Sequence, residues 1–201
     1  MRYTWLIDAG HGGFMDGEYV TGPKKMYEHS PSEIFYEGMF NRQIKDALMR
    51  DLWNNNIQAI DLCPTELDVQ LDVRVDIANI YHREYHNCVG ISLHSNAGKG
   101  TGFEIHTGPE ETRSDVHARL LGQILIERFQ GINYRKGDAP GELDKDSLFY
   151  ILYKTKSPWI LPECLFFDNY EDYKKLMDPY FRIRYVDALV AYIKQAENEN
   201  I

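Results

Sequence analysis

The chain has 201 residues, of which 43% are hydrophobic and 26% charged, which is enough for one globular domain with a substantial core. Its 22 basic and 31 acidic residues give a net charge of −9 without a dense Lys/Arg cluster, which argues against nucleic acid as a partner. No stretch is long enough for a membrane span and no signal-peptide pattern is seen, so we expect synthesis in the cytoplasm.

The first predicted strand covers residues 3–9 and runs into the segment Gly-His-Gly-Gly. Its glycines permit backbone conformations that are closed to other residues, so a loop is expected there. His11 therefore lies just beyond the end of an apolar strand.

A helix is predicted to begin at residues 30–33, where the sequence is Ser-Pro-Ser-Glu. Serine is a good N-cap, proline fits the first helical position, and glutamate at the third position completes a capping box. Four residues at spacings of three and four form the inward stripe of this helix: Glu37, Asn41, Ile44 and Leu48. Three charged residues are expected to point elsewhere: Arg42, Lys45 and Asp46.

Strands and helices alternate along the rest of the chain. Strands are expected at about 58–62, 88–94, 102–107 and 159–166, and helices at about 69–85, 114–130 and 180–194. The polar, glycine-bearing stretch 131–146 is predicted to be a surface loop that borders the site. This alternation predicts an α/β fold: one domain over residues 1–201, with a mostly parallel twisted sheet of about five or six strands and helices on both faces.

Two histidines follow predicted strand ends, where ligands gather in parallel sheets. His11 follows the first strand, and His94 closes the apolar run CVGISLH. Catalytic zinc takes three protein ligands from His and Asp/Glu and leaves a fourth position for water. With Glu37 on the inward helix stripe, the sequence supplies such a set, and we predict a zinc site.

Glu163 is a lone acid inside the apolar strand WILPECLFF. A glutamate beside a metal centre can take a proton from water and return it to a departing amine, which is general base and general acid catalysis. Cys164 follows it directly, and strand alternation turns the two side chains to opposite faces. We expect Glu163 to face the site and Cys164 to pack as a small hydrophobic residue, with neither a disulfide framework nor a cysteine zinc site.

Each of these residues also has an ordinary structural explanation. A histidine after a strand is usually a hydrogen-bonded structural residue, Glu37 can pair with an arginine, and Glu163 can pair with a lysine. His82 and His86 are four apart on a predicted helix, but no HExxH pattern joins them, and solvation is the simpler interpretation. His106 lies on a strand near the site, where a structural role is favoured over a substrate contact. A thiol nucleophile at Cys164 is the competing chemistry.

Four segments, in this order, resemble the zinc-dependent N-acetylmuramoyl-L-alanine amidases of the amidase 3 family: LIDAGHGG, YEGMFNRQI, RVDIANIYHREYHNCVGISLHSNAG and TKSPWILPECLFFDN. The resemblance covers nearly the whole chain. It implies zinc ligands at His11, Glu37 and His94, a catalytic role for Glu163, and a structural role for Asn169. It also implies a supporting role for the asparagine that follows the glutamate ligand by four residues.

The resemblance implies peptidoglycan as the substrate, cleaved between N-acetylmuramic acid and the L-alanine of the stem peptide. The alternatives are a zinc metallopeptidase or amidase acting on another peptide, and a non-catalytic cell-wall-binding domain of the same fold. A compact chain of this kind resembles endolysins, which reach the wall after release from the cytoplasm. The chain departs from the family pattern in the bulky residues after Glu163 and in the region between residues 13 and 31.

Overall fold

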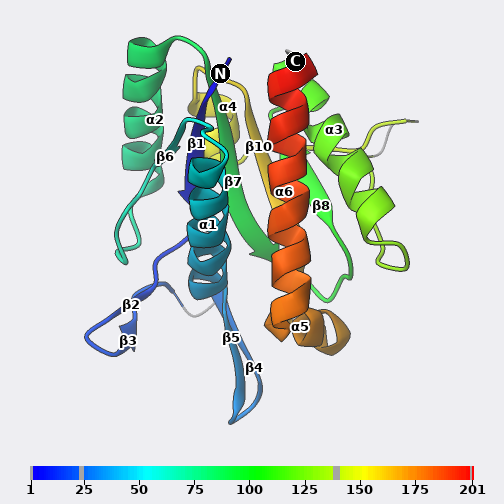
Figure 1. Ribbon diagram of the computed structural model, residues 1–201. Helices are drawn as coiled ribbons and strands as arrows, with labels where there is room; N and C mark the ends of the chain where they lie inside the picture. Colours follow the sequence, from blue (N-terminus) through cyan, green and yellow to red (C-terminus); the bar gives the residue numbers. More distant parts are fainter. Residues whose placement is uncertain (1, 23–24, 138–140, 200) are drawn as a thin grey trace.

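The structure is a computed structural model that describes residues 2–22, 25–137, 141–199 and 201 (Figure 1). The strands are β1 (Thr4–Ala9), β2 (Phe14–Met15), β3 (Glu18–Tyr19), β4 (Met26–Ser30), β5 (Glu33–Tyr36), β6 (Ala59–Asp61), β7 (Cys88–Asn96), β8 (Glu104–Thr107), β9 (Lys145–Asp146) and β10 (Trp159–Phe166). The helices are α1 (Glu37–Asn54), α2 (Leu71–Tyr85), α3 (Arg113–Arg128), α4 (Tyr150–Lys154), α5 (Tyr170–Met177) and α6 (Pro179–Glu199).

Six strands of the described chain form the main sheet, in the order β6-β1-β7-β10-β8-β9. The first four of these run parallel, β8 is antiparallel to β10, and β9 is parallel to β8. The predicted fold class is therefore confirmed. Because β1 and β7 are parallel neighbours, their carboxyl ends lie at the same edge of the sheet.

Helices cover both faces of the sheet. In Figure 1, α1 and α6 lie in front of the strands, and together with α3 they bury the larger apolar cluster, which includes Leu48, Leu121 and Leu189. The smaller cluster lies on the other face, where Val75 of α2 and Ile151 of α4 pack on the sheet. The sheet edge that carries the strand ends is left between these two layers.

The predicted helix start at residues 30–33 is wrong, because these residues form the turn of the β4–β5 hairpin. Ser30 pairs with Glu33 across a two-residue turn, and α1 begins only at Glu37. Proline and serine also suit the central positions of a β-turn, so the same letters fit both structures. The segment Glu-Ile-Phe-Tyr after the turn contains β-prone residues, which favours a strand over a helix. The hairpin projects beyond the sheet at the end where β7 terminates (Figure 1).

The inward stripe of α1 is as predicted, with Glu37, Asn41, Ile44 and Leu48 all buried. Arg42 and Lys45 were expected to point away, yet they are buried as well. Each has polar partners inside: Arg42 donates to the carbonyl of Thr65, and Lys45 pairs with Asp61. Buried charges are tolerated where such partners replace water.

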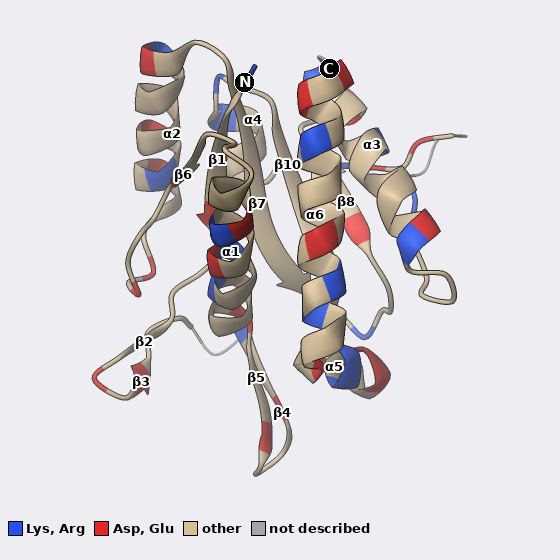
Figure 2. Cartoon of the chain, viewed as in Figure 1, with Lys and Arg blue, Asp and Glu red and all other residues tan. Residues whose placement is uncertain are grey.

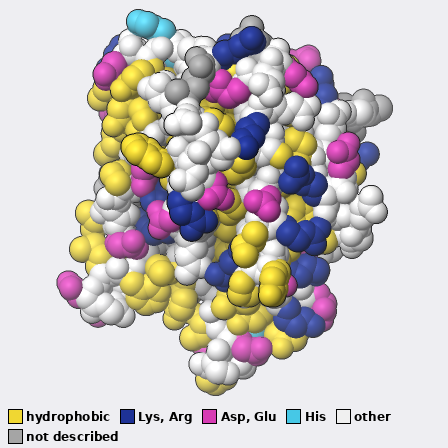
Figure 3. All heavy atoms as spheres, in the orientation of Figure 1, with side chains coloured by type: hydrophobic (Ala, Val, Ile, Leu, Met, Phe, Trp, Pro, Cys, Tyr) yellow, Lys and Arg dark blue, Asp and Glu magenta, His cyan; other side chains and the backbone are white. Residues whose placement is uncertain are grey.

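Charges of both signs are distributed over the surface. Both α1 and α6 carry basic and acidic residues (Figure 2), and Figure 3 shows charged residues interspersed with hydrophobic side chains on this face. This face therefore presents no broad basic surface. Within the described residues, no helix combines the length and apolar character that crossing a membrane requires.

Candidate active site

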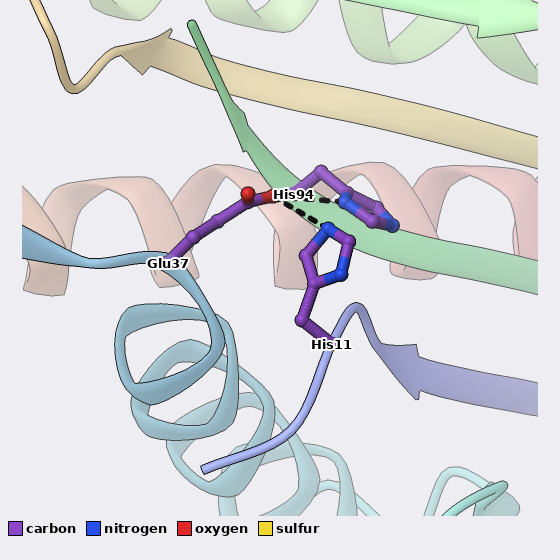
Figure 4. Close-up of side chains that lie close together, drawn as sticks. All are labelled: His11, Glu37 and His94. Carbon is purple, nitrogen blue, oxygen red and sulfur yellow. Dashed lines mark hydrogen bonds and ion pairs between the residues drawn. The ribbon is translucent and has the colours of Figure 1, made fainter. Parts of the chain in front are cut away.

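Three side chains converge at the carboxyl edge of the sheet (Figure 4). His11 follows the end of β1, His94 lies near the end of the neighbouring strand β7, and Glu37 is the first residue of α1. The carboxylate of Glu37 points between the two imidazole rings. A negative side chain at this position is also stabilised by the helix dipole.

The atoms of this cluster are close enough to hold one metal ion. Oε1 of Glu37 lies 3.0 Å from Nδ1 of His94 and 3.3 Å from Nε2 of His11. One ligand atom from each of the three residues lies within 4.8 Å of the others. Among the described residues, Nε2 of His11 and Oε2 of Glu37 are buried without a hydrogen-bond partner. Two imidazoles and one carboxylate with unused ligand atoms fit a catalytic zinc site.

The backbone of His11 is held in an uncommon conformation. Its φ is 67°, in the left-handed region that residues with a Cβ rarely occupy. Its carbonyl accepts hydrogen bonds from Arg42, at 2.8 Å from Nη1, and from Arg74, at 3.2 Å from Nη2. Gly10 is required beside it, because a Cβ there would lie 2.1 Å from the ring of His94. Asn41 donates to the carbonyl of Gly10 at 3.1 Å.

A buried network connects β1, β7 and α2 beneath the cluster. Arg74 pairs with Asp8 and donates to the carbonyl of Ala9 at 2.8 Å. The other carboxylate oxygen of Asp8 accepts from Ser92 of β7 at 2.7 Å. These contacts fix the strand ends that carry the two histidines. Sequence analysis did not assign this role to Arg74 and Asp8, because a buried ion pair leaves no periodic signal.

Burial and mutual charge set the protonation of the cluster. Burial opposes the charged form of Glu37, but its close contacts with both imidazoles outweigh burial and hold the pKa of this carboxyl well below its usual range. Burial lowers the pKa of His11, whereas the contact with Glu37 overcomes burial at His94 and raises the pKa of that imidazole. Lys25 adds a positive charge 3.6 Å from Oε2 of Glu37.

Glu163 lies one strand away from His94, directly opposite it in the register of β10 and β7. It lines a cavity of about 440 Å³ together with both histidines and Lys25. Burial raises the pKa of Glu163 to about 7, and within the described part of the chain its Oε2 has no hydrogen-bond partner. Neither an arginine nor a lysine of the described residues forms an ion pair with this carboxylate.

Part of the cavity wall is apolar. Val69 lies just before α2 and Leu71 begins it, Phe149 lies just before α4 and Tyr150 begins it, and Leu161 comes from β10. A ligand that enters between these helices meets Glu163 and the histidines, and apolar walls that exclude bulk water strengthen electrostatic interactions.

Cys164 points into the core on the opposite face of β10, as strand alternation predicts. It is fully buried, and burial raises the pKa of the thiol well above its usual value. A thiolate nucleophile therefore finds no support here.

The other predicted candidates lie outside the cluster. His106 bonds to Oγ of Ser147 at 2.7 Å and lies 3.4 Å from Glu104, and His82 and His86 join no metal-binding group of the described residues. Asn169 is the N-cap of α5, which agrees with a structural role.

A second acidic group, not predicted, is formed by Asp115, Asp144 and Asp146. Asp115 already belongs to the capping box of α3, and Asp144 accepts from Thr107 at 2.8 Å. The histidine cluster thus remains the better metal site.

The fold and this site define an α/β protein with a candidate metal centre at the carboxyl ends of its parallel strands. The chain matches the family described as N-acetylmuramoyl-L-alanine amidase over residues 6–195, and it belongs to that family. The resemblance read from the four sequence segments is thereby confirmed at the level of the family.

Similar proteins share this description. The amidase CwlM of Bacillus licheniformis is 29% identical over 88% of this chain and 61% of its own length. The sporulation-specific N-acetylmuramoyl-L-alanine amidase of Bacillus subtilis is 25% identical over 85% of this chain and 59% of its own. The chain thus spans about three fifths of the length of these curated relatives. The crystal structure of an N-acetylmuramoyl-L-alanine amidase from Clostridium difficile has the same fold, with a TM-score of 0.79, 23% identity, and coverage of 98% and 97% of the two chains.

Proposed function

We propose that this chain is a zinc-dependent N-acetylmuramoyl-L-alanine amidase. In this proposal it hydrolyses the amide bond between the lactyl group of N-acetylmuramic acid and the L-alanine of the peptidoglycan stem peptide. The observation that carries the proposal is the convergence of His11, Glu37 and His94 beside the unpaired carboxylate of Glu163, in a chain of this family.

His11, Glu37 and His94 would hold the zinc through two imidazole nitrogens and one carboxylate oxygen. When bound, zinc is a Lewis acid that polarises the amide carbonyl and makes water more acidic. Arg42 and Arg74 keep the ligand geometry by fixing the backbone of His11.

Glu163 moves the proton. Its unpartnered Oε2 accepts a proton from the attacking water and then donates it to the alanine nitrogen as the C–N bond breaks. The apolar side chains of Val69, Leu71 and Leu161 limit the access of bulk water to this carboxylate.

Zinc content and peptidoglycan hydrolysis, measured on the same samples, test these roles. We expect Glu163→Gln to keep zinc and to lose hydrolysis by about 10²-fold or more, because general acid–base catalysis contributes that much. We expect His94→Ala to lose both, and a chelator to inactivate the wild type until zinc is restored. Full zinc content in His94→Ala, or full hydrolysis by Glu163→Gln, would refute the assignment.

The products distinguish this reaction from its alternatives. Cleavage at the lactyl amide exposes new alanine amino termini and creates no new reducing sugars. A metallopeptidase would expose a different amino terminus, and a wall-binding domain would bind peptidoglycan without releasing peptide.

The endolysin-like role, with action on the wall after release from the cytoplasm, remains a prediction. Lysis of intact cells by internally expressed protein, compared with and without a membrane-permeabilising agent, tests it. Lysis that needs no permeabilisation would contradict it.

A further inference from the structure

The row of paired residues that contains His94 and Glu163 continues across the sheet to the next strand. Glu163 of β10 pairs with His94 on one side and with Glu104 of β8 on the other. Directly paired residues of neighbouring strands point to the same face of a sheet. Glu104 therefore extends the row by one strand, on the side away from the histidine cluster.

Glu104 is a buried carboxylate that holds two cations. Arg135 donates its Nε to Oε1 of Glu104, and Nζ of Lys145 lies 2.8 Å from the same oxygen. Asn96 donates to Oε2 at 2.9 Å, with His106 at 3.4 Å. Two formal positive charges thus face the single negative charge of Glu104.

The two cations are open to solvent, although their anchor is not. The side chain of Glu104 is 6% exposed, whereas those of Arg135 and Lys145 are 41% and 27% exposed. Arg135 precedes residues 138–140, which lie outside the described part of the chain, and Lys145 follows them as the first residue of β9. The guanidinium of Arg135 also lies over the ring of Phe166, 5.3 Å from its centre. The contacts with Glu104 and Phe166 hold the charged groups of Arg135 and Lys145 in place, and the solvent-exposed side of these groups can bind a ligand.

The distance between neighbouring strands determines which part of a bound peptide can lie near Arg135 and Lys145. Neighbouring strands are about 4.8 Å apart, and a charge-assisted hydrogen bond adds about 3 Å. An extended peptide advances about 3.3–3.6 Å per residue, so two residues span a similar distance. In the proposed function the leaving alanine nitrogen lies at Glu163, and a peptide that extends from there toward β8 follows this row of residues. The second stem residue then comes opposite the cations.

We propose that Arg135 and Lys145, positioned by Glu104, form a subsite that binds the free carboxylate of the second residue of the stem peptide. The proposal rests on the proposed amidase function. In peptidoglycan this residue is a glutamate linked through its side chain, and its α-carboxylate is either free or amidated. A local positive charge selects the free acid and counteracts the repulsion of an anionic peptide by a chain of net charge −9.

The test compares two muramyl peptides that differ only in a free or amidated α-carboxylate at this residue. For the wild type we expect kcat/KM to favour the free acid about tenfold, through KM rather than kcat, and less so at high salt. Arg135→Met and Lys145→Met should each bring this ratio close to one, and Arg135→Lys and Lys145→Arg should keep most of it. Each Met variant leaves Glu104 one cation, and thermal unfolding verifies its fold. Lys194→Met makes the same charge change on the exposed surface of α6 and should keep the wild-type ratio.

A direct binding measurement separates the subsite from the reaction. The free L-alanyl-glutamyl peptide and its amide are titrated into the zinc-loaded protein by calorimetry. The free acid should bind about tenfold more tightly than the amide in the wild type, and about equally in the two Met variants. If neither muramyl peptide is hydrolysed, the proposed function fails while this titration still decides on the subsite. Equal binding of acid and amide by the wild type, or an unchanged preference in both Met variants, would overturn the inference.

Discussion

His11 adopts a left-handed backbone conformation, which costs a residue with a Cβ about 1–2 kcal/mol. Such strain persists only where surrounding contacts determine the conformation. Here the contacts are hydrogen bonds from Arg42 and Arg74 to the carbonyl of His11. The two arginines therefore determine where one proposed zinc ligand lies, although neither guanidinium forms an ion pair with the side chains of His11, Glu37 and His94.

We predict that Arg42→Met lowers zinc affinity about tenfold, because the backbone of His11 can then relax out of the ligand geometry. A tenfold change corresponds to about 1.4 kcal/mol, within the strain that the contact stabilises. Competition with a chromophoric chelator measures the affinity. Arg50→Met removes an exposed arginine from the same helix and should leave the affinity unchanged. Equal affinities in both variants would mean that Arg42 does not position His11.

The residues that sequence analysis could identify are those whose position in an element is unusual. His11 and His94 follow strand ends, Glu37 lies on an inward stripe, and Glu163 interrupts an apolar strand. The structure places His11, His94 and Glu163 around one cavity, with Glu37 in contact with both imidazoles, and their catalytic and metal-binding roles remain predictions. Lys25 and the cations around Glu104 could not be found, because their importance depends on contacts between distant segments.

At the scale of elements, the residues that were predicted to form the first helical turn belong to the β4–β5 hairpin. Ser-Pro-Ser-Glu satisfies both a capping box and a β-turn, so local chemistry alone cannot choose. Tertiary packing makes the choice: Phe35 is 2% exposed and stacks on Phe167 at 5.2 Å. The hairpin leads directly into Glu37, the first residue of α1, so the position of the hairpin determines the position of this proposed ligand.

We predict that Phe35→Ala destabilises the zinc-free protein by about 3–5 kcal/mol, since it leaves a cavity among aromatic rings. It should also weaken zinc binding, because β5 then holds Glu37 less firmly. Urea unfolding and chelator competition measure the two effects. Tyr27→Ala truncates an exposed ring of the same hairpin and should cost less than about 1 kcal/mol. An intact zinc affinity in Phe35→Ala would show that Glu37 is positioned by α1 alone.

At the scale of the whole molecule, the α/β class followed from alternating strand and helix patterns, because burial of both sheet faces dictates those patterns. The apolar runs at 88–94 and 159–166 correctly indicated two strands, and the structure places these strands, β7 and β10, in the centre of the sheet. The order of the strands and the antiparallel β8 could not be predicted, since they depend on long-range pairing. The sheet then aligns His94, Glu163 and Glu104 in one row, which no local pattern of the sequence contains.

The stability of the whole molecule should depend on pH through His117, which lies apart from the cavity residues. Its ring is fully buried in α3 against Tyr3 and Trp5, and its Nδ1 lies 3.0 Å from the hydroxyl of Tyr192. Burial, aided by the charge of Arg113, lowers the pKa of His117 to about 4. The unfolded chain, with a histidine pKa of about 6.5, thus takes up this proton at a higher pH than the folded protein does.

Between pH 6.5 and about 4 the unfolded state binds more protons, so the free energy of unfolding must fall as the pH decreases, and the loss levels off below about pH 4. At about 1.36 kcal/mol per unit of pKa shift, this loss is on the order of 3 kcal/mol. We predict that His117→Asn, which keeps a polar group near Tyr192 but cannot titrate, loses about that much less stability over the same range. Urea unfolding of the zinc-free proteins at pH 7, 5.5 and 4 measures the difference, and parallel curves for the two proteins would contradict the prediction. Because both proteins carry the same cluster of His11, Glu37 and His94, the titration of that cluster cancels in the comparison.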